Sequence, residues 1–282
     1  LNNDIGVPQT LFQLDRTNDY AVIEMGASHI GEIEWLAHIA QPQIGVITLC
    51  APAHIEGFGS IDNVAQAKGE LYAGLIEGGT AVINADDDFA DYWADVAKNH
   101  RIVRFGIEHE ADVAAQDISI NGVAKGVRFK LQLPSAEIEI DLQFDGLHNV
   151  YNALAAAATT WALKVPIENI KLGLESTHKI GGRLCVYSAL HDARIIDDTY
   201  NANPASLAAA IDLLAAEDGE KWLVLGDMGE LGPNAVKLHS QAGQSARSAG
   251  IDRLYTFGDL AASAAAEFGP EAQSHRNVDE LI

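Results

Sequence analysis

The sequence predicts an α/β protein with a mostly parallel sheet, organised as two domains. Three observations support this fold class. Short apolar segments alternate with segments of helical periodicity, the order expected of parallel strands joined by helices. The alternation breaks near Ala111 and resumes after Gly181 and Gly182. The length of 282 residues corresponds to about two compact domains. We therefore expect one domain over residues 1–178 and a second over residues 179–282.

The first domain is expected to pair strands with helices and then to change its pattern. Ser60 is a good N-cap for the helix that follows it. The predicted strands are Tyr20–Met25, Ile44–Leu49, Thr80–Asn84 and Arg101–Phe105. The predicted helices between them are Gly31–Ala40, Ser60–Ile76 and Asp87–Lys98. Alternating apolar and polar residues then predict a hairpin, and two helices follow it: Gly126–Leu133 with Glu137–Leu142, then His148–Leu163 and Pro166–Leu174.

The second domain repeats the α/β order in a Rossmann-like arrangement. Pro204 is suited to the first position of a helix. The predicted strands are Leu184–Ser188, Arg194–Asp197, Lys221–Leu225 and Arg253–Phe257. The predicted helices are Pro204–Ala216, Asn234–Ala249 and Asp259–Phe268.

Composition excludes several classes of protein. Hydrophobic residues make up 48% and charged residues 21%, which is ordinary for a globular protein. The net charge of −22 opposes binding of nucleic acid or of an anionic membrane, so an anionic ligand needs local positive groups. No segment reaches the ~18 apolar residues of a membrane span. Cys50 and Cys185 are isolated and are expected to be reduced thiols of a cytosolic protein.

Polar residues follow the ends of several predicted strands. They are Glu24, His54, Glu56, Asp197, Asp198 and Asp227. Each one alone is more simply a loop residue or a helix cap. Ligands of open parallel sheets bind beside the carboxyl ends of the strands, so the succession of these residues predicts a site there.

Lys68 interrupts an apolar stripe of its predicted helix. The stripe consists of Ile61, Val64, Leu71 and Leu75, with Lys68 in the middle position. Burying an unpaired ammonium is costly, so Lys68 should be paired, line a cavity or be chemically modified. The ordinary alternative is a lysine whose stem packs on the stripe while its amine reaches solvent.

Two kinds of ligand site are compatible with these residues. Glu24 can supply a carboxylate to Mg²⁺, with His54 as a less usual ligand. Zinc is disfavoured because His29 and His54 lie in separate loops and the sequence has neither an HExxH nor a CxxC motif. The GxGxxG and GxxxxGK[ST] phosphate-binding motifs are also absent from the sequence.

A nucleotide could be held elsewhere in the chain. The helix beginning near His148 and Asn149 would present N-terminal amides, although asparagines in a first turn are commonly caps. Arg183 follows two glycines and suits bidentate contact with a phosphate. The turn 197–204 carries two carboxylates, an aromatic ring and two amides, more polar groups than a simple turn needs.

Several of these segments resemble the Mur ligase family. They are Asn2–Pro8, Glu24–Ala27, Ala53–Ser60, Ala67–Glu70, Gly146–Asn152, Gly182–Arg183, Asp198–Pro204 and Leu225–Gly232. They extend over almost the whole chain in a consistent order. The resemblance implies a central ATPase domain followed by the C-terminal domain of the family. Within the family, residues 56–60 and 200–204 favour the ligase that joins D-alanyl-D-alanine to UDP-MurNAc-tripeptide.

The resemblance also implies a chemistry and a set of site residues. ATP would phosphorylate the substrate carboxylate, and the incoming amine would attack the acyl phosphate, in the cytoplasm and in a monomeric enzyme of peptidoglycan synthesis. The implied catalytic residues are Lys68, His54 and Asp198. The implied Mg²⁺ ligands are Glu24, His54 and, if carbamylated, Lys68; the implied ATP contacts are Asn149, Arg183, Asp198, Tyr200 and Asn201; the implied substrate contacts are Ser28 and His29.

The chain also departs from the family pattern. The family's UDP-binding domain and P-loop would precede Asn2, and its C-terminal domain would continue past Ile282. We therefore expect the 282-residue chain to be a fragment that binds ATP weakly and does not ligate.

Three alternatives remain. One is another ligase of the superfamily, such as a folylpolyglutamate synthetase-like enzyme. A second is a non-catalytic nucleotide-binding module. The third is a metal-dependent hydrolase using His54 and Glu56.

Overall fold

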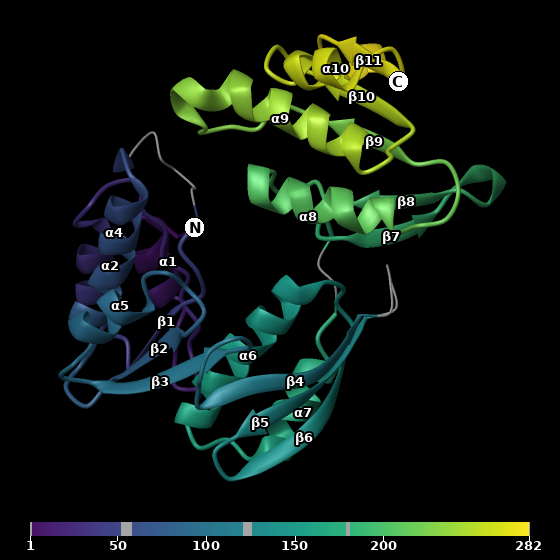
Figure 1. Cartoon of the computed structure of the whole chain (residues 1–282). Helices are drawn as coiled ribbons and strands as arrows, with labels where there is room; N and C mark the ends of the chain where they lie inside the picture. The colour runs from purple at the N-terminus through teal and green to yellow at the C-terminus, as the bar shows by residue number, and fades with distance from the viewer. Residues whose placement is uncertain (1, 52–57, 121–125, 179–180, 282) are drawn as a thin grey trace. The chain divides into compact units, whose positions relative to one another are not determined.

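The computed structural model describes residues 2–51, 58–120, 126–178 and 181–281 (Figure 1). The chain divides into two compact units, each of which is described by itself. Unit 1 comprises Leu1–Ile118, Phe129–Ile140 and His148–Glu175. Unit 2 comprises Ser119–Arg128, Asp141–Leu147 and Ser176–Ile282.

A six-stranded sheet is the framework of the first part of the chain, in the order β1-β2-β3-β4-β5-β6. Its strands are β1 (Ile44–Ile47), β2 (Thr80–Asn84), β3 (Arg101–Gly106), β4 (Val113–Ile120), β5 (Val127–Leu133) and β6 (Ala136–Leu142). The pairs β1–β2, β2–β3 and β3–β4 are parallel. The short turn between β5 and β6 requires an antiparallel pair, as the predicted hairpin does.

Helices flank this sheet along the chain. They are α1 (Gly6–Leu11), α2 (Glu32–Ala40), α4 (Ile61–Ala73), α5 (Ala90–Val96), α6 (Leu147–Ala162) and α7 (Ile167–Glu175). α7 lies behind β6 in the view of Figure 1, and Lys171 Nζ donates to Glu139 O at 2.5 Å. Ser60 caps α4 as predicted, because its hydroxyl accepts from Asn63 N at 3.2 Å.

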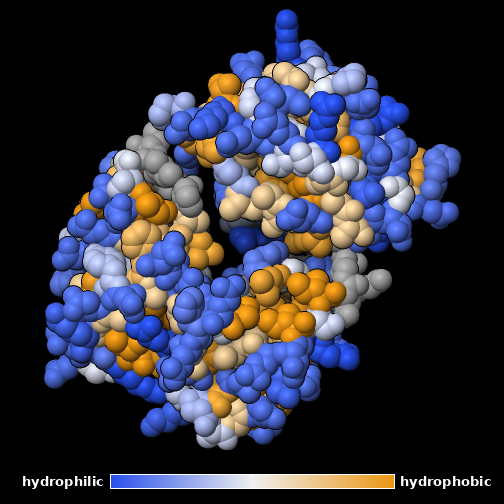
Figure 2. Space-filling model, viewed as in Figure 1, coloured by the Kyte–Doolittle hydropathy of each residue, from blue (hydrophilic) through white to orange (hydrophobic). Residues whose placement is uncertain are grey.

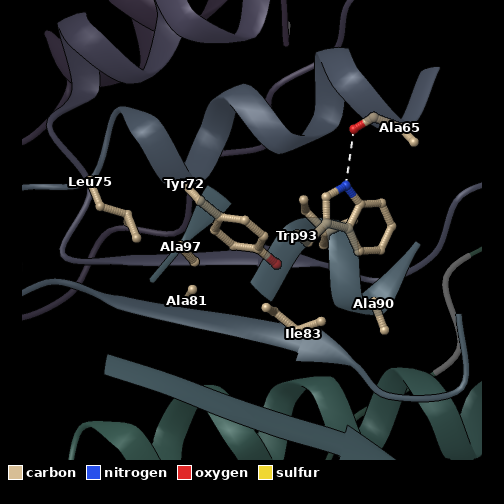
Figure 3. Packing of buried hydrophobic residues seen from close by; sticks show 9 residues of the cluster. Ala65, Tyr72, Leu75, Ala81, Ile83, Ala90, Trp93 and Ala97 are labelled. Carbon is tan, nitrogen blue, oxygen red and sulfur yellow. Dashed lines mark hydrogen bonds between the residues drawn. The ribbon is translucent and has the colours of Figure 1, made fainter. Parts of the chain in front are cut away.

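The core of unit 1 fixes α4 over β2. Figure 3 shows Trp93 and Tyr72 among small and branched apolar side chains. Both aromatic residues are fully buried, and both find a hydrogen-bond acceptor. The Trp93 indole N–H donates to Ala65 O at 2.9 Å, and the Tyr72 hydroxyl donates to Val82 O at 2.7 Å. The position of Lys68, on the same helix, is therefore tied to the sheet.

The predicted strand at Tyr20–Met25 is wrong. This segment has no strand structure, and Tyr20 and Val22 are 68% and 97% exposed. Apolar residues favour burial, but a strand also needs a neighbouring backbone with which to pair. The adjacent Gly26 donates its N–H to Asn2 O at 2.8 Å and thus joins the segment to the region before α1.

Other differences are smaller. The helix predicted from Asp87 begins at Ala90, because the Asp87 carboxylate accepts from Phe89 N at 3.0 Å and closes a turn first. β4 was not predicted, since the second half of this strand is largely exposed and lacks a regular apolar alternation. The helix α1 was not predicted either. The remaining predicted elements of this part of the chain are confirmed within a few residues.

Unit 2 contains a three-stranded parallel sheet in the order β11-β10-β9 and a separate antiparallel pair, β7 with β8. The strands are β7 (Cys185–Ser188), β8 (Arg194–Asp197), β9 (Trp222–Leu225), β10 (Arg253–Phe257) and β11 (Ala272–His275). The helices are α8 (Pro204–Ala215), α9 (Ala235–Ser248), α10 (Ala262–Phe268) and α11 (Val278–Leu281), with short 3-10 turns at Leu190–Asp192 and Gly232–Asn234. β11 and α11 were not predicted, whereas the other strands and helices were.

The core of unit 2 forms where α8, α9 and α10 meet the sheet. Its buried members include Leu207, Ile211, Leu225, Met228, Leu254 and Phe268. The predicted fold class, α/β with a mostly parallel sheet, is confirmed. Figure 2 shows hydrophilic residues over much of the visible face of the molecule. Within the described residues, no helix has the length and apolar character needed to cross a membrane.

Candidate functional site

The ends of β1 and β2 are joined by two side chains. Asn84 Nδ2 donates to Thr48 O at 2.9 Å. Asp87 Oδ2 accepts from Cys50 N at 2.6 Å. The backbone that leaves β1 is therefore held against the turn after β2. His54 and Glu56, which were predicted on the strength of their place after this strand, lie outside the described residues.

Lys68 lies within the buried surface of α4, but the predicted stripe was too narrow. The buried residues of this helix are Val64, Ala65, Ala67, Gly69 and Tyr72. At 100° per residue, position 68 falls near the centre of the arc that they form. The arc is wide because α4 packs both on α2 and on β1. Lys68 itself is half-buried.

The amine of Lys68 acts electrostatically on the end of β1. Burial raises the pKa of the Cys50 thiol to about 11; the Asp87 carboxylate adds to the rise, and the Lys68 ammonium opposes it. Lys68 forms no hydrogen bond or ion pair with another described residue. A half-buried amine beside a strand end is the arrangement expected of a lysine that lines a site.

Glu24 is exposed, and it comes from an irregular segment rather than from a strand. Its Oε1 accepts from Asn2 Nδ2 at 3.0 Å. Asn3 Oδ1 accepts at 2.9 Å from the N–H of Gly6, the first residue of α1. The carboxylate of Glu24 is thus oriented by the segment before α1 and is chemically suited to a hard cation.

Two glutamates hold the loop that carries Ser28 and His29. Glu32 Oε2 accepts from Ser28 N at 2.7 Å and from His29 N at 3.1 Å, and its Oε1 lies 3.1 Å from His29 Nδ1. The Ser28 amide, followed by the His29 ring, keeps the pKa of Glu32 below its usual value. Glu70 accepts from Gly31 N at 2.7 Å and from Glu34 N at 3.1 Å. Ser28 and His29 remain exposed in an ordered loop.

Asp86 was missed by the sequence analysis, although it occupies the end of β2. Its side chain is 6% exposed. Oδ2 accepts from Ile107 N at 2.6 Å, from Glu108 N at 3.1 Å and from the Tyr151 hydroxyl at 2.9 Å. Oδ1 accepts from His109 N at 2.7 Å and lies 3.0 Å from His109 Nδ1. The signal that could have found this residue is the acidic run Asp86–Asp88 just after a fully buried strand.

The electrostatics of Asp86 follow from these donors. Burial by itself would raise the pKa of Asp86, but the backbone N–H groups of residues 107–109 and the Tyr151 hydroxyl outweigh burial and lower it. In turn, burial and the Asp86 carboxylate raise the pKa of Tyr151. In this pair Asp86 is therefore the carboxylate acceptor, and the Tyr151 phenol is the donor. A cavity of about 670 Å³ opens beside it, lined by Asp86, Asp87, Asp88, Arg104, His109 and Asp112 among others.

The first turn of α6 carries an amide network. Asn152 Nδ2 donates to Asn149 Oδ1 at 3.2 Å. Asn149 Nδ2 lies 3.0 Å from His148 Nε2. Tyr151, which contacts Asp86, belongs to the same turn. The predicted nucleotide contact Asn149 is thus linked through its own helix to the end of β2.

In unit 2 the structure brings together Arg183, Asp198 and Tyr200, which the sequence analysis had assigned to one site with Asn201, the residue that follows Tyr200. The Arg183 guanidinium lies 4.1 Å above the Tyr200 ring centroid. Tyr200 N donates to Gly182 O at 2.9 Å, and Leu184 N donates to Asp198 Oδ1 at 3.3 Å. Arg183, Tyr200 and Asn201 are exposed, and Asp198 is half-buried.

Gly182 is required for this arrangement. Its φ of +79° lies in the left-handed region, and a Cβ there would stand 3.0 Å from Tyr200 N. Its N–H donates to Asp197 Oδ2 at 3.2 Å. The glycine therefore lets the segment before β7 approach the turn after β8.

Other polar residues of unit 2 have structural roles. Asn203 forms a capping box with Ser206 at the start of α8, where Pro204 is the first residue. Asp227 Oδ1 accepts from Ala261 N at 2.7 Å and so anchors the segment before α10. Both residues therefore fit the simpler interpretation, in which such a polar residue is a helix cap or a loop anchor.

The residues present can support nucleotide chemistry. Exposed Arg183 and Tyr200 offer a guanidinium fork and a ring face, and Glu24 offers an exposed carboxylate. Within the described ranges, no group of three His, Cys, Asp or Glu residues is arranged to hold a metal ion. Mg²⁺ commonly takes only one or two protein ligands and completes its shell with water and phosphate, so Glu24 fits such a cation.

Comparison with known families gives matches over most of the chain. The family described as the Mur ligase middle domain matches residues 1–160. The family described as the Mur ligase, glutamate ligase domain matches residues 182–282.

Individual proteins give the same assignment. The chain is 41% identical over 259 residues to a UDP-N-acetylmuramoyl-tripeptide–D-alanyl-D-alanine ligase of Escherichia coli K12, covering 92% of this chain and 57% of the relative. It is 42% identical over 261 residues to the ligase of the same name from Haemophilus influenzae, covering 93% and 56%. A crystal structure of MurF from Acinetobacter baumannii superposes with a TM-score of 0.91 at 36% identity, covering 99% of this chain and 60% of that one. The chain thus spans somewhat more than half the length of these relatives.

Proposed function

This chain belongs to the Mur ligase family, and from that premise we propose that its protein joins D-alanyl-D-alanine to UDP-MurNAc-tripeptide at the expense of ATP. The observation that carries the proposal is the 41% identity to the Escherichia coli ligase, which runs through 92% of the chain. The protein is then an ATP-dependent peptide ligase of peptidoglycan precursor synthesis, acting in the cytoplasm as a monomer. The division into domains at residues 178 and 179 is part of the same proposal.

In this reaction ATP transfers its γ-phosphoryl group to the terminal carboxylate of the tripeptide. The amine of D-alanyl-D-alanine attacks the resulting acyl phosphate, the new C–N bond forms, and phosphate leaves. Such chemistry depends on positioning and on neutralising charge rather than on covalent catalysis by the protein. Because the chain carries a net charge of −22, this neutralisation must be local.

We assign the residues of unit 1 to the reacting end of the substrates. Glu24 and His54 would hold Mg²⁺, which supplies positive charge to the phosphate oxygens when it is bound. Lys68, as a carbamate, would add a carboxylate-like group beside them. Ser28 and His29 would contact the muramyl substrate, and the loop fixed by Glu32 and Glu70 supports that role.

We assign the nucleotide to Asn149 of unit 1 and to Arg183, Asp198, Tyr200 and Asn201 of unit 2. The guanidinium of Arg183 can contact a phosphate with two N–H groups. The ring of Tyr200 is 65% exposed and can stack on a planar group. The clustering of Arg183, Asp198 and Tyr200 in unit 2 supports the assignment.

The carbamate of Lys68 would form by reaction of its amine with CO₂. The neutral amine attacks CO₂, a N–C bond forms, and one proton is released to solvent, leaving a negative charge. The half-buried setting of Lys68, close enough to the end of β1 to act on the Cys50 thiol, supports the proposal.

One experiment tests the proposed reaction. Phosphate release by the protein that carries this chain is measured with UDP-MurNAc-tripeptide and Mg-ATP, with and without D-alanyl-D-alanine. We expect release to require the dipeptide, and Lys68→Ala to lower kcat at least a hundredfold. Lys98→Ala is the matched control, since Lys98 is exposed and pairs with Asp95 on the surface.

Carbon-13-labelled bicarbonate gives a second readout that is independent of turnover. A carbamate resonance present in the wild type and absent from Lys68→Ala would support the assignment. Release that depends on glutamate and a folate instead of the dipeptide would favour a folylpolyglutamate synthetase-like enzyme. Nucleotide binding with no turnover would favour a non-catalytic module.

A further inference from the structure

We propose that Asp86 is a positioning residue, which fixes the first turn of α6 through Tyr151 and thereby sets the place of the Asn149 amide. The consequence for nucleotide binding rests on the proposed function. Asp86 does not belong to any segment that carries the family resemblance, and it does not touch the residues assigned to the substrates.

Asp86 is fixed in place by its hydrogen bonds. Three consecutive backbone N–H groups, those of Ile107, Glu108 and His109, donate to its two oxygens. Its own backbone N–H donates to Asn84 Oδ1 at 3.1 Å. A buried carboxylate with this many donors has little freedom to move.

The Asp86 carboxylate also contacts one residue of a helix, Tyr151 of α6. The Tyr151 hydroxyl, 65 residues away in sequence, donates to Oδ2 at 2.9 Å. Tyr151 is half-buried and lies two residues after Asn149. A shift of this turn relative to β2 would therefore break a hydrogen bond to a charged acceptor, which is stronger than a neutral one.

The start of α6 also carries a group of polar side chains next to Tyr151. Asn149, Asn152 and His148 form a chain of side-chain contacts at the start of α6. These contacts hold the three side chains relative to one another. The contact between Tyr151 and Asp86 supplies a link to the carboxyl end of β2, beside the cavity of about 670 Å³.

The test removes only the hydrogen bond between Tyr151 and Asp86. Tyr151→Phe keeps the ring and deletes the hydroxyl, leaving the backbone contacts of Asp86 in place. Tyr72→Phe is the matched control, because it also deletes a tyrosine hydroxyl hydrogen bond, the one to Val82 O, but in the core between α4 and β2. Both variants are compared with the wild type for thermal stability.

The first readout is amide hydrogen exchange of the 282-residue chain without nucleotide. We expect exchange in residues 151–154 to become at least fivefold faster in Tyr151→Phe and to stay unchanged in Tyr72→Phe. Unchanged exchange at the start of α6 in Tyr151→Phe would overturn the proposal, whatever the chain binds.

The second readout is the equilibrium affinity for Mg-ATP of the protein that carries this chain. We expect Tyr151→Phe to weaken binding three- to tenfold, and Tyr72→Phe to leave it unchanged even where it lowers the melting temperature more. Equal weakening by the two variants would assign Tyr151 a merely structural role and overturn the proposal. If wild type binds no ATP while exchange responds as expected, the proposed function fails and the positioning role of Asp86 stands.

Discussion

Asp86 and Asp198 are both aspartates that follow a strand, yet their surroundings differ. Asp86, in unit 1, is 6% exposed and accepts hydrogen bonds from a folded-back loop and from α6. Asp198, in unit 2, is half-buried, and Leu184 N donates to it at 3.3 Å. The chain after β3 returns over the end of β2, whereas Asp198 lies in the turn 198–203 that leads from β8 into α8. A carboxylate at a strand end is therefore a structural anchor or an available ligand according to what the next loop does.

We expect the largest effect when the stability of Asp86→Asn is compared with that of Asp198→Asn. In Asp86→Asn the amide group cannot accept from all the donors around it, and buried N–H groups lose their partners. We expect the free energy of unfolding to fall by about 3 kcal/mol. Asp198→Asn should change it by at most about 0.5 kcal/mol. Urea unfolding of both variants measures the difference.

The same two substitutions should affect the affinity for Mg-ATP differently. We expect Asp198→Asn, which removes a charge from the proposed nucleotide turn, to change the dissociation constant about tenfold. If the two variants lost equal stability, or if Asp198→Asn left binding untouched, the contrast between anchor and ligand would be lost.

A second prediction uses pH to sharpen the contrast. The pKa of Asp86 is lowered in the folded protein from an ordinary value of 3.8. A lowered pKa contributes stability that is fully present above the unfolded value and is lost as the pH falls through the folded value. The melting temperature of the wild type should therefore fall as the pH drops below about 4, and Asp86→Asn should lack part of that fall.

Asp197→Asn serves as the comparison for the acid titration. The pKa of Asp197 is also lowered, first by the Thr199 hydroxyl and then by the Thr199 amide, but these donors are local and exposed. We expect Asp197→Asn to keep most of the acid sensitivity of the wild type. Equal acid curves for wild type and Asp86→Asn would contradict the assigned cause.

The regular elements were predictable because local signals specify them. The fully buried strand Thr80–Asn84 and the Pro204 helix start are confirmed to within one residue. Tyr20–Met25 failed because its apolar composition says nothing about a partner strand. The Lys68 position was predicted on the apolar surface of its helix, but the width of that surface depends on α2, which local periodicity does not report.

Part of the candidate site was predicted through the family resemblance, although its residues come from separate segments. Arg183 and Tyr200 were assigned to one site from sequence, and the structure stacks them. Asp86 was missed because its role depends on Tyr151, 65 residues away, and on backbone groups that any residue could supply. Roles played by the main chain leave little trace in a single sequence.

The smallest expected effect tests whether the exposed cluster of unit 2 is a ligand site. Arg183→Lys keeps the charge but loses the planar fork and its stacking on Tyr200. An exposed cation–π contact contributes about 0.5–1 kcal/mol, so stability should change little, while the dissociation constant for Mg-ATP should rise about three- to tenfold. Arg194→Lys is the control, because this exposed arginine of the same unit pairs with Glu217. If Arg194→Lys weakened binding as much as Arg183→Lys, the effect would report the general charge of unit 2, and the exposed cluster would not be the place where the nucleotide is held.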